Sequence, residues 1–450
     1  MDIQGWNDWL NGYVWGMPMI VLLMGTGLLL TVLTRGVQVR LLALSFREVL
    51  GKIGKRTTGS GSVTPFQAVA TALASTVGVG NIAGVATAIH LGGPGALFWL
   101  WLSGLFGMGT KFAEIVLALH YREADETGTM RGGAMYVLRK GLHMPWLGTV
   151  FAVLVPLAAF GIGNMVQANS VADSLRSSFG LSPWVTGVIL VAVTALVILG
   201  GITRIGEVTS LLVPFMAIVY LGGGLVILIR YAGALPGAIE MVFEGAFTGT
   251  AAAGGFAGST VGMALRYGVA RGLFSNEAGL GSAPMVHATA QTDHPVRQGL
   301  YGIFEVFVDT ILVCTTTGLV ILATGSWSAG ETGAALAGRA FSIGLPGTAG
   351  NIVVTVSLVL FAYSTIIGWS YYGETGITYL FGARAAMPYR ILWLVFVFLG
   401  AIGSLRLVWG VADTLNGLMA IPNLVALLGS IPVILALLRE YEQRRQGKRL

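Results

Sequence analysis

Long apolar runs recur from one end of the chain to the other, and short polar segments separate them. A helical run of this kind is long enough to cross about 30 Å of hydrocarbon. The first run extends from Val14 to Leu33. Ten further spans are predicted at residues 62–90, 93–119, 146–178, 183–201, 207–231, 260–287, 299–324, 350–380, 387–403 and 407–437. The pattern predicts an all-α polytopic membrane protein with about eleven transmembrane helices.

The composition and the placement of charge support this class. The chain is 55% hydrophobic and 10% charged, whereas soluble domains carry about 25% charged residues. Basic residues fall at the ends of the spans, and none precedes the first span. Because Lys and Arg mark cytoplasmic segments, we expect a cell-membrane protein with its N-terminus outside and its C-terminus in the cytoplasm. This topology depends on Arg35, Arg40, Arg47, Lys52, Lys55, Arg56, Arg122, Arg131, Arg139, Lys140, Arg204, Arg297, Arg384, Arg390, Arg439, Arg444, Arg445, Lys448 and Arg449.

The positions of the basic residues also indicate which partners the protein has. Residues 37–56 are predicted to form an amphipathic helix on the cytoplasmic surface. The net charge of +6 therefore reflects topology, so membrane lipid is expected as a partner and nucleic acid is not.

Two glycine-rich hexapeptides indicate an internal repeat. They are TVGVGN (76–81) and EAGLGS (277–282), and each interrupts an apolar span. The offset between them also brings the second to fifth core spans onto the last four spans. Two halves of five helices must run in opposite directions through a membrane, and inverted repeats opened by broken helices are typical of secondary transporters. The expected organisation is an extra N-terminal helix with the amphipathic segment (1–61), a first repeat (62–231), a second repeat (232–437) and a basic cytoplasmic tail (438–450).

The first break suggests a binding site. Backbone groups that a helix break exposes inside a membrane need partners. Amides from Gly78 to Asn81 would lie at the positive end of a half-helix and can bind a carboxylate. Carbonyls from Ala74 to Val77 can coordinate an alkali ion.

Several motifs resemble those of one transporter family. ASTVGVGN (74–81) resembles the first broken helix of the sodium-coupled leucine-transporter fold, although Ser75 and Thr76 replace its Asn and Ala. GGPGALFWLWLSGLFG (92–107) is similar to the signature of the alanine/glycine:cation symporter family, with Leu100 in place of the usual Met. Further matching motifs are GNMVQANS (163–170), GLFSNEAGLGSAP (272–284), IIGWSYYGE (366–374) and ADTLNGLMAIPN (412–423). The resemblance implies symport of alanine or glycine into the cell, with sodium as the co-transported ion.

The candidate substrate residues come from the break, the repeat and the resemblance. Gln167 lies mid-span, and the repeat offset relates it to Gly368, next to Trp369. Both side chains are expected to face one cavity; the alternatives are an interhelical hydrogen bond for Gln167 and packing for Trp369. By resemblance, Phe274 covers the substrate, while Asn276 binds its amine or caps the next half-helix. The predicted set is Ser75, Thr76, Gly78, Gly80, Gln167, Phe274, Asn276 and Trp369.

The candidate sodium ligands rest on the resemblance. Ser364 and Thr365 match a pair that holds sodium in the leucine-transporter fold, together with the carbonyls of Ala74, Val77 and Phe361. These three carbonyls and two hydroxyls would form a neutral cage that suits a hard monovalent cation. Ser275 also matches a sodium-ligand position. A second site is expected among Thr76, Asn81, Ser275, Asp309 and Thr310.

Carboxylates inside spans are functional candidates by default. Glu305 and Asp309 are four residues apart and are expected to share a helix face. Glu277 is expected to pair with Arg271, and Glu114 with Lys111. Asp413 and Asn416 are interpreted as gate or water-facing residues. Together these carboxylates suggest proton coupling as the alternative to sodium.

Other function classes have less support. The five histidines fall at or beyond the ends of spans, so none is expected beside the carboxylates, and no constellation for an enzyme is predicted. No phosphate-binding loop is present, which leaves ATP-driven transport without support. A channel would share the apolar character, but the inverted repeat favours alternating access. Cys314 is expected to be a small buried hydrophobe.

Overall fold

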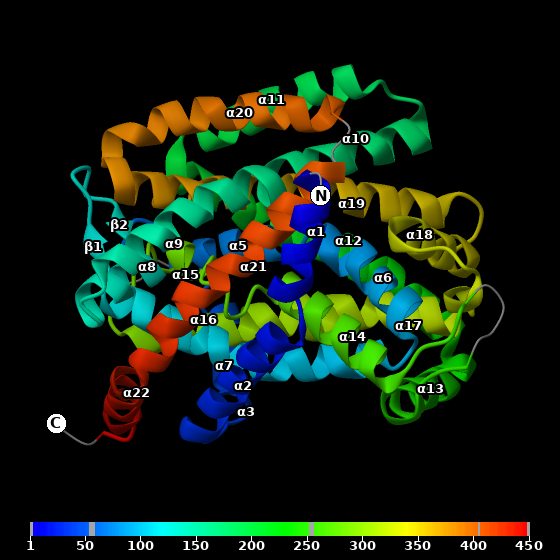
Figure 1. Ribbon diagram of the computed structural model, residues 1–450, viewed down its shortest axis with the longest axis horizontal. Helices are drawn as coiled ribbons and strands as arrows, with labels where there is room; N and C mark the ends of the chain where they lie inside the picture. The colour runs from blue at the N-terminus through cyan, green and yellow to red at the C-terminus, as the bar shows by residue number, and fades with distance from the viewer. Residues whose placement is uncertain (1–2, 54–58, 252–255, 404–405, 448–450) are drawn as a thin grey trace.

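The computed structural model describes residues 3–53, 59–251, 256–403 and 406–447, and most of them are helical (Figure 1). The N-terminal part consists of α1 (Ile3–Val14), α2 (Met17–Leu33), α3 (Val37–Arg40) and α4 (Leu42–Leu50). The predicted amphipathic helix at 37–56 is therefore two short helices, and Lys55 and Arg56 lie outside the described residues. The other two basic residues outside the described part are Lys448 and Arg449.

The first half of the core contains eight helices and a small hairpin. The helices are α5 (Pro65–Thr76), α6 (Val85–Gly92), α7 (Ala96–His120), α8 (Ala134–Tyr136), α9 (Pro145–Ala158), α10 (Val166–Phe179), α11 (Pro183–Ile198) and α12 (Gly201–Arg230). π-Helical turns join some of them, at Gly80–Gly84, Val137–Gly141 and Ala159–Met165. Between α7 and α8, strand β1 (Glu123–Ala124) pairs antiparallel with β2 (Met130–Arg131), an element that the apolar pattern did not predict.

The second half repeats this helical character. Its helices are α13 (Leu235–Thr248), α14 (Val261–Asn276), α15 (Pro284–His287), α16 (Pro295–Val306), α17 (Thr315–Ala323), α18 (Gly333–Gly344), α19 (Ala349–Phe381), α20 (Ala386–Ile402), α21 (Arg406–Gly429) and α22 (Ile431–Arg445). A π-helical segment, Phe307–Cys314, joins α16 to α17. The predicted C-terminal boundary of the last span, residue 437, is wrong. The helix α21 ends at Gly429, and a separate helix, α22, follows it.

Eight helices in the described part are long and apolar enough to cross a membrane, and a bent pair makes a ninth. The pair is Pro65–Thr76 with Gly80–Gly92, bent by 51°. Two of the eleven predicted spans are not single helices that are long and apolar enough to cross a membrane. The span at 183–201 is the shorter apolar helix α11, and the span at 260–287 is divided into α14 and α15.

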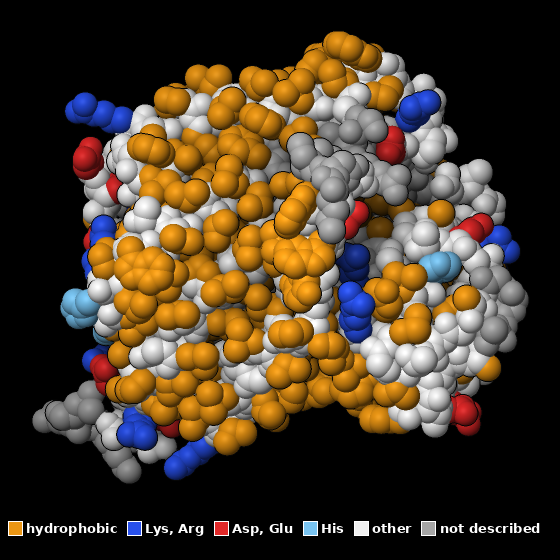
Figure 2. Space-filling view, in the orientation of Figure 1, with side chains coloured by type: hydrophobic (Ala, Val, Ile, Leu, Met, Phe, Trp, Pro, Cys, Tyr) orange, Lys and Arg blue, Asp and Glu red, His pale blue; other side chains and the backbone are white. Residues whose placement is uncertain are grey.

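The long helices pack side by side, with the interrupted helices among them (Figure 1). α5 packs against α12 and α19, and α14 packs against α6 and α7. Glycines allow these approaches: a Cβ at Gly272 would overlap the Ser103 hydroxyl, and one at Gly368 would overlap the Ser75 hydroxyl. On the face shown in Figure 2, apolar side chains form a broad surface, and many charged side chains lie along its left and right edges. The close packing holds the two breaks near each other.

Candidate functional site

The first helix break begins where α5 ends. α5 starts with a capping box in which Thr64 and Gln67 exchange hydrogen bonds. Its last regular turn closes with the amide of Val77 on the Leu73 carbonyl at 2.8 Å, and Val77 then adopts an extended ψ of 93°. The amide of Gly78 donates to Asn81 Oδ1 at 2.9 Å. A side chain, rather than the helix ladder, thus satisfies this exposed backbone group.

The second break begins at Glu277, where α14 ends in a left-handed residue with φ of 54°. Gly279 and Gly281 also have positive φ, a conformation that glycine adopts without steric cost. Their amides donate to Glu114 Oε1 at 3.0 and 3.1 Å, and Asn423 Nδ2 donates to the same oxygen at 2.6 Å. Glu114 on α7 therefore stabilises the non-helical segment after α14.

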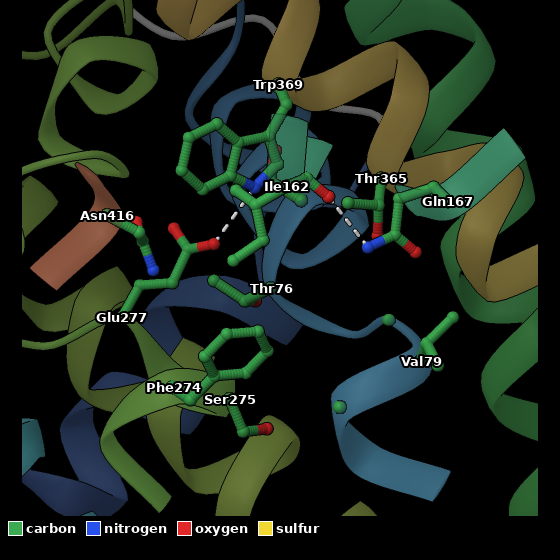
Figure 3. A pocket seen from close by; sticks show the side chains of 13 residues that line it. Thr76, Val79, Ile162, Gln167, Phe274, Ser275, Glu277, Thr365, Trp369 and Asn416 are labelled. Atoms are coloured by element: carbon green, nitrogen blue, oxygen red, sulfur yellow. Dashed lines mark hydrogen bonds between the residues drawn. The ribbon is translucent and has the colours of Figure 1, made fainter. Parts of the chain in front are cut away.

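A small cavity of about 30 Å³ lies between the two breaks (Figure 3). Since a water needs about 10–15 Å³ on this measure, the cavity has room for about two waters. Seven of the eight predicted substrate residues line it, and Asn276 does not. Its Oδ1 instead accepts the Ala278 amide at 3.0 Å, which is the capping alternative. The full lining is Ser75, Thr76, Gly78, Val79, Gly80, Ile162, Gln167, Phe274, Ser275, Glu277, Thr365, Trp369 and Asn416.

Two side chains from different helices face this cavity, as the offset between the glycine motifs predicted. Gln167 comes from α10, and its Nε2 donates to the Ile162 carbonyl at 2.9 Å. Trp369 comes from α19, and its Nε1 donates to Glu277 Oε1 at 3.0 Å (Figure 3). The Gln167 Oε1 is buried without a hydrogen-bond partner. The sequence reasoning did not place Glu277 in the cavity, although its position next to the second glycine motif was a usable signal.

Phe274 borders the small cavity and two larger ones. It lines all three, and the larger two measure about 130 and 120 Å³. The Arg271 guanidinium lies over the Phe274 ring at 5.6 Å and borders both larger cavities. Asp413 borders the second of them and accepts a hydrogen bond from Asn11 of α1 at 3.0 Å. Phe274 is therefore part of the wall of the cavity at the breaks and of the wider spaces beside Arg271.

The structure brings together four of the five predicted ligands of the first sodium site. Ser364 Oγ donates to the carbonyls of Ala74, at 3.0 Å, and Phe361, at 2.9 Å. Thr365 Oγ1 also donates to the Phe361 carbonyl, at 2.9 Å. The Thr365 side chain lies against Gly78, where a Cβ would come within 2.8 Å of its hydroxyl. α5 and α19 thus meet through an oxygen-rich contact at the first break.

Four residues of the second predicted sodium set also lie together, around Asp309. The carboxylate accepts from Asn81 Nδ2 at 2.7 Å, from Ser275 Oγ at 2.9 Å and from Thr310 Oγ1 at 2.8 Å. All four side chains are buried. Thr76 is not part of this cluster; its hydroxyl donates to Ala72 and it lines the cavity. Among the described residues, Asp309 has no Lys or Arg partner within 4.0 Å.

The expected pairing of the other buried charges is wrong. Lys111 Nζ lies 3.5 Å from Glu305 Oε1, not against Glu114. His287 Nε2 is 2.9 Å from Glu305 Oε2, so a histidine is embedded with a carboxylate, contrary to the prediction. Glu305 and Asp309 engage different partners, and the π-helical segment Phe307–Cys314 begins between them.

The other expected pair, Glu277 with Arg271, is absent from the ion pairs of the described residues. Cys314 is buried, as predicted, and its Sγ lies 3.4 Å from Asn81 Nδ2.

Comparison with known proteins decides the family. The chain matches the sodium:alanine symporter family over residues 1–450. It belongs to that family. It is 48% identical to the sodium/alanine symporter AgcS of Methanococcus maripaludis, over 100% of this chain and 99% of the relative. It is 36% identical to the amino-acid carrier protein AlsT of Bacillus subtilis, over 97% and 92% of the two chains.

Solved structures show the same fold at low sequence identity. MhsT in complex with L-phenylalanine is 14% identical, with a TM-score of 0.56 over 86% of this chain and 99% of that one. A mutant of the manganese transporter of Eremococcus coleocola is 16% identical, with a TM-score of 0.51 over 85% and 81%. The family and the leucine-transporter-like fold predicted from the motifs are confirmed, and membership of a transporter family rules out the enzyme alternative.

Proposed function

We propose that this protein carries alanine and glycine into the cell together with sodium, by alternating access. The observation that carries this proposal is one cavity bordered by the first helix break and flanked by two oxygen-rich clusters. The full-length similarity to a sodium/alanine symporter supports the same substrate and ion. The small volume of the cavity favours amino acids with little or no side chain.

The substrate carboxylate would bind at the first break. The Gly78 amide is already bonded to Asn81 Oδ1, and the Asn81 amide to the Gly78 carbonyl. The amides of Val79 and Gly80, which line the cavity, would therefore receive the carboxylate, at the positive end of the following half-helix. Gln167 would hydrogen-bond the substrate, while Trp369 and Phe274 would limit its size.

Sodium would occupy the two oxygen-rich clusters. In the first, the hydroxyls of Ser364 and Thr365 would turn their oxygens to the ion beside the carbonyls of Ala74, Val77 and Phe361. In the second, the Asp309 carboxylate would supply the negative charge, with Ser275, Thr310, Thr76 and Asn81 as further candidate ligands. Carboxylate, carbonyl and hydroxyl oxygens are the ligands that hard cations prefer.

Proton coupling is the second candidate. It is favoured by the buried cluster in which Glu305 contacts both Lys111 and His287, because such chains of ionisable groups serve as proton relays in transporters.

The membrane arrangement is also a proposal. Eleven crossings would result if α11 and the interrupted α14–α15 segment each cross once, which gives two inverted repeats (62–231 and 232–437). An N-terminus outside and a C-terminus inside is supported by basic segments that gather at one end. There Arg40 pairs with Glu442 at 2.9 Å, and Arg297 lies 3.9 Å from Glu48.

Uptake of labelled alanine into vesicles containing the purified protein tests the function. Saturable uptake that requires an inward sodium gradient, and that stops when choline replaces sodium, is expected. Uptake that is indifferent to sodium but follows a pH gradient would select the proton-coupled alternative. Flux that does not saturate would identify a channel and refute the proposal.

A further inference from the structure

Glu277 is the acidic residue that lines the small cavity, and neither the break chemistry nor the sodium clusters uses it. We propose that its carboxylate binds the ammonium group of the transported amino acid and makes the site selective for amines. The inference rests on the proposed function, because it concerns how that same cavity recognises its substrate.

The Glu277 carboxylate accepts hydrogen bonds but has no direct ion-pair partner among the described residues. One carboxylate oxygen accepts the Trp369 indole N–H at 3.0 Å, and the other accepts the Ser282 hydroxyl. The residue is only 4% exposed. No Lys, Arg or His nitrogen of the described residues lies within 4.0 Å of the carboxylate. A buried charge without a partner is costly, and a bound ammonium would supply the missing partner with charge-assisted hydrogen bonds.

Two more side chains in the cavity offer acceptors. Gln167 Oε1 and Asn416 Oδ1 are both buried and have no hydrogen-bond partner among the described residues, and both residues line the cavity with Glu277. A primary ammonium has three N–H donors and no acceptor. The cavity thus has donors at Val79 and Gly80 for a carboxylate, and unpaired acceptors elsewhere for an ammonium. This polarity fits a zwitterion.

The backbone at Glu277 gives a further reason to assign it a role. Its φ of 54° lies in the left-handed region, which a side chain with a Cβ enters at a cost and which glycine adopts freely. Gly279 and Gly281 follow it with positive φ. A glutamate held in such a conformation is a feature that clusters at functional sites, and here the conformation accompanies a carboxylate in the cavity.

A structural role for Glu277 makes a different prediction. If the carboxylate only held the Trp369 indole in place, its negative charge would be dispensable. Glu277→Gln separates the two roles, because its amide oxygen still accepts the indole N–H while the charge is removed. Ser282→Ala is the complementary variant, since it removes the hydroxyl donor to Glu277 and keeps the carboxylate.

The test compares alanine with lactate, which replaces the ammonium by a hydroxyl at nearly constant size. Binding of each is measured by calorimetry on purified protein in saturating sodium. The parent protein should prefer alanine by at least a hundredfold. Glu277→Gln should reduce that preference at least tenfold, mainly by weakening alanine binding, and Ser282→Ala should keep the preference within about threefold of the parent.

Two results would overturn the proposal. An unchanged alanine-to-lactate preference in folded Glu277→Gln would show that the charge does not recognise the amine. The proposal would also be overturned if the parent protein bound lactate with an affinity within tenfold of its affinity for alanine. Failure of the proposed function is distinguishable, because the parent would then bind no alanine in the presence of sodium.

Discussion

Replacement of Thr365 by valine tests the first sodium cluster most directly. Thr365 is buried on α19, and its hydroxyl donates to the Phe361 carbonyl at 2.9 Å. Valine keeps the shape of the side chain and removes the oxygen. Ser364 Oγ also donates to the Phe361 carbonyl, so this carbonyl keeps a partner in the variant. The substitution should therefore remove an ion ligand with little damage to the fold.

The magnitude follows from the loss of one oxygen from a cage of five. An interaction with a charged group contributes about 1.5–3 kcal/mol, and each 1.4 kcal/mol is about a tenfold change in affinity. The sodium concentration for half-maximal alanine binding should rise about 10- to 100-fold in Thr365→Val, by these same figures. Much of the alanine affinity should return at saturating sodium, because coupling between the two ligands is reciprocal.

The assay is alanine binding to purified protein over a series of sodium concentrations. Thr378→Val is the matched control, since Thr378 lies on the same helix, is buried, and donates to the Thr375 carbonyl at 3.2 Å away from the break. It should leave the sodium dependence unchanged. An unaltered sodium dependence in Thr365→Val would refute the ligand assignment. If alanine binding to the parent protein did not depend on sodium but changed with pH, the proposed five-oxygen sodium site would be refuted. Glu305 and Asp309 would then become the candidate coupling groups.

Further substitutions test the cavity and the buried ion pairs of Glu374. Gln167→Ala should weaken alanine binding by about 1.5–3 kcal/mol, as for a lost hydrogen bond to a charged group; calorimetry that gives parent affinity would remove Gln167 from the site. Trp369→Ala should weaken alanine binding but allow leucine to compete, because a cavity wall also excludes larger ligands; alanine binding that persists without any leucine competition would make Trp369 a packing residue. Glu374 accepts from Arg131 at 3.1 Å and from Arg390 at 2.7 Å. In Glu374→Ala, Arg131 keeps its ion pair with Asp125 but Arg390 loses this carboxylate, so the variant should lower stability by about 1–3 kcal/mol. A thermal unfolding midpoint equal to that of the parent would contradict this.

Local sequence properties were sufficient to predict the two helix breaks. Glycines at 78, 80, 279 and 281 weaken a helix wherever they occur, and the structure interrupts both helices at these motifs. The repeat offset between the motifs then placed Gln167 and Trp369 at one cavity, and both line it. The breaks could be predicted because the effect of glycine on a helix is local. The shared cavity could be predicted because the offset between the motifs related residues of two distant helices.

The partners of the buried charges depend on packing between distant helices, which the sequence did not reveal. Lys111 is three residues from Glu114, and local spacing suggested that they pair. In the structure, α16 packs against α7 and brings Glu305 to Lys111, while Glu114 turns to the amides of Gly279 and Gly281. The π-helical segment Phe307–Cys314 begins between Glu305 and Asp309, and no apolar pattern predicted this change of helix type.

The segment from Ala74 to Asn81 provides a physical route for coupling ions to substrate. Its Ala74 carbonyl contacts Ser364 on α19, and its Asn81 amide group contacts Asp309 in the segment between α16 and α17. Between these two contacts lie Val79 and Gly80, which line the cavity. An ion at either cluster would therefore fix one end of the same eight-residue segment whose middle would bind the carboxylate. Since a ligand shifts an equilibrium only by its differential affinity for the states, sodium can order the substrate site through this segment without touching the substrate.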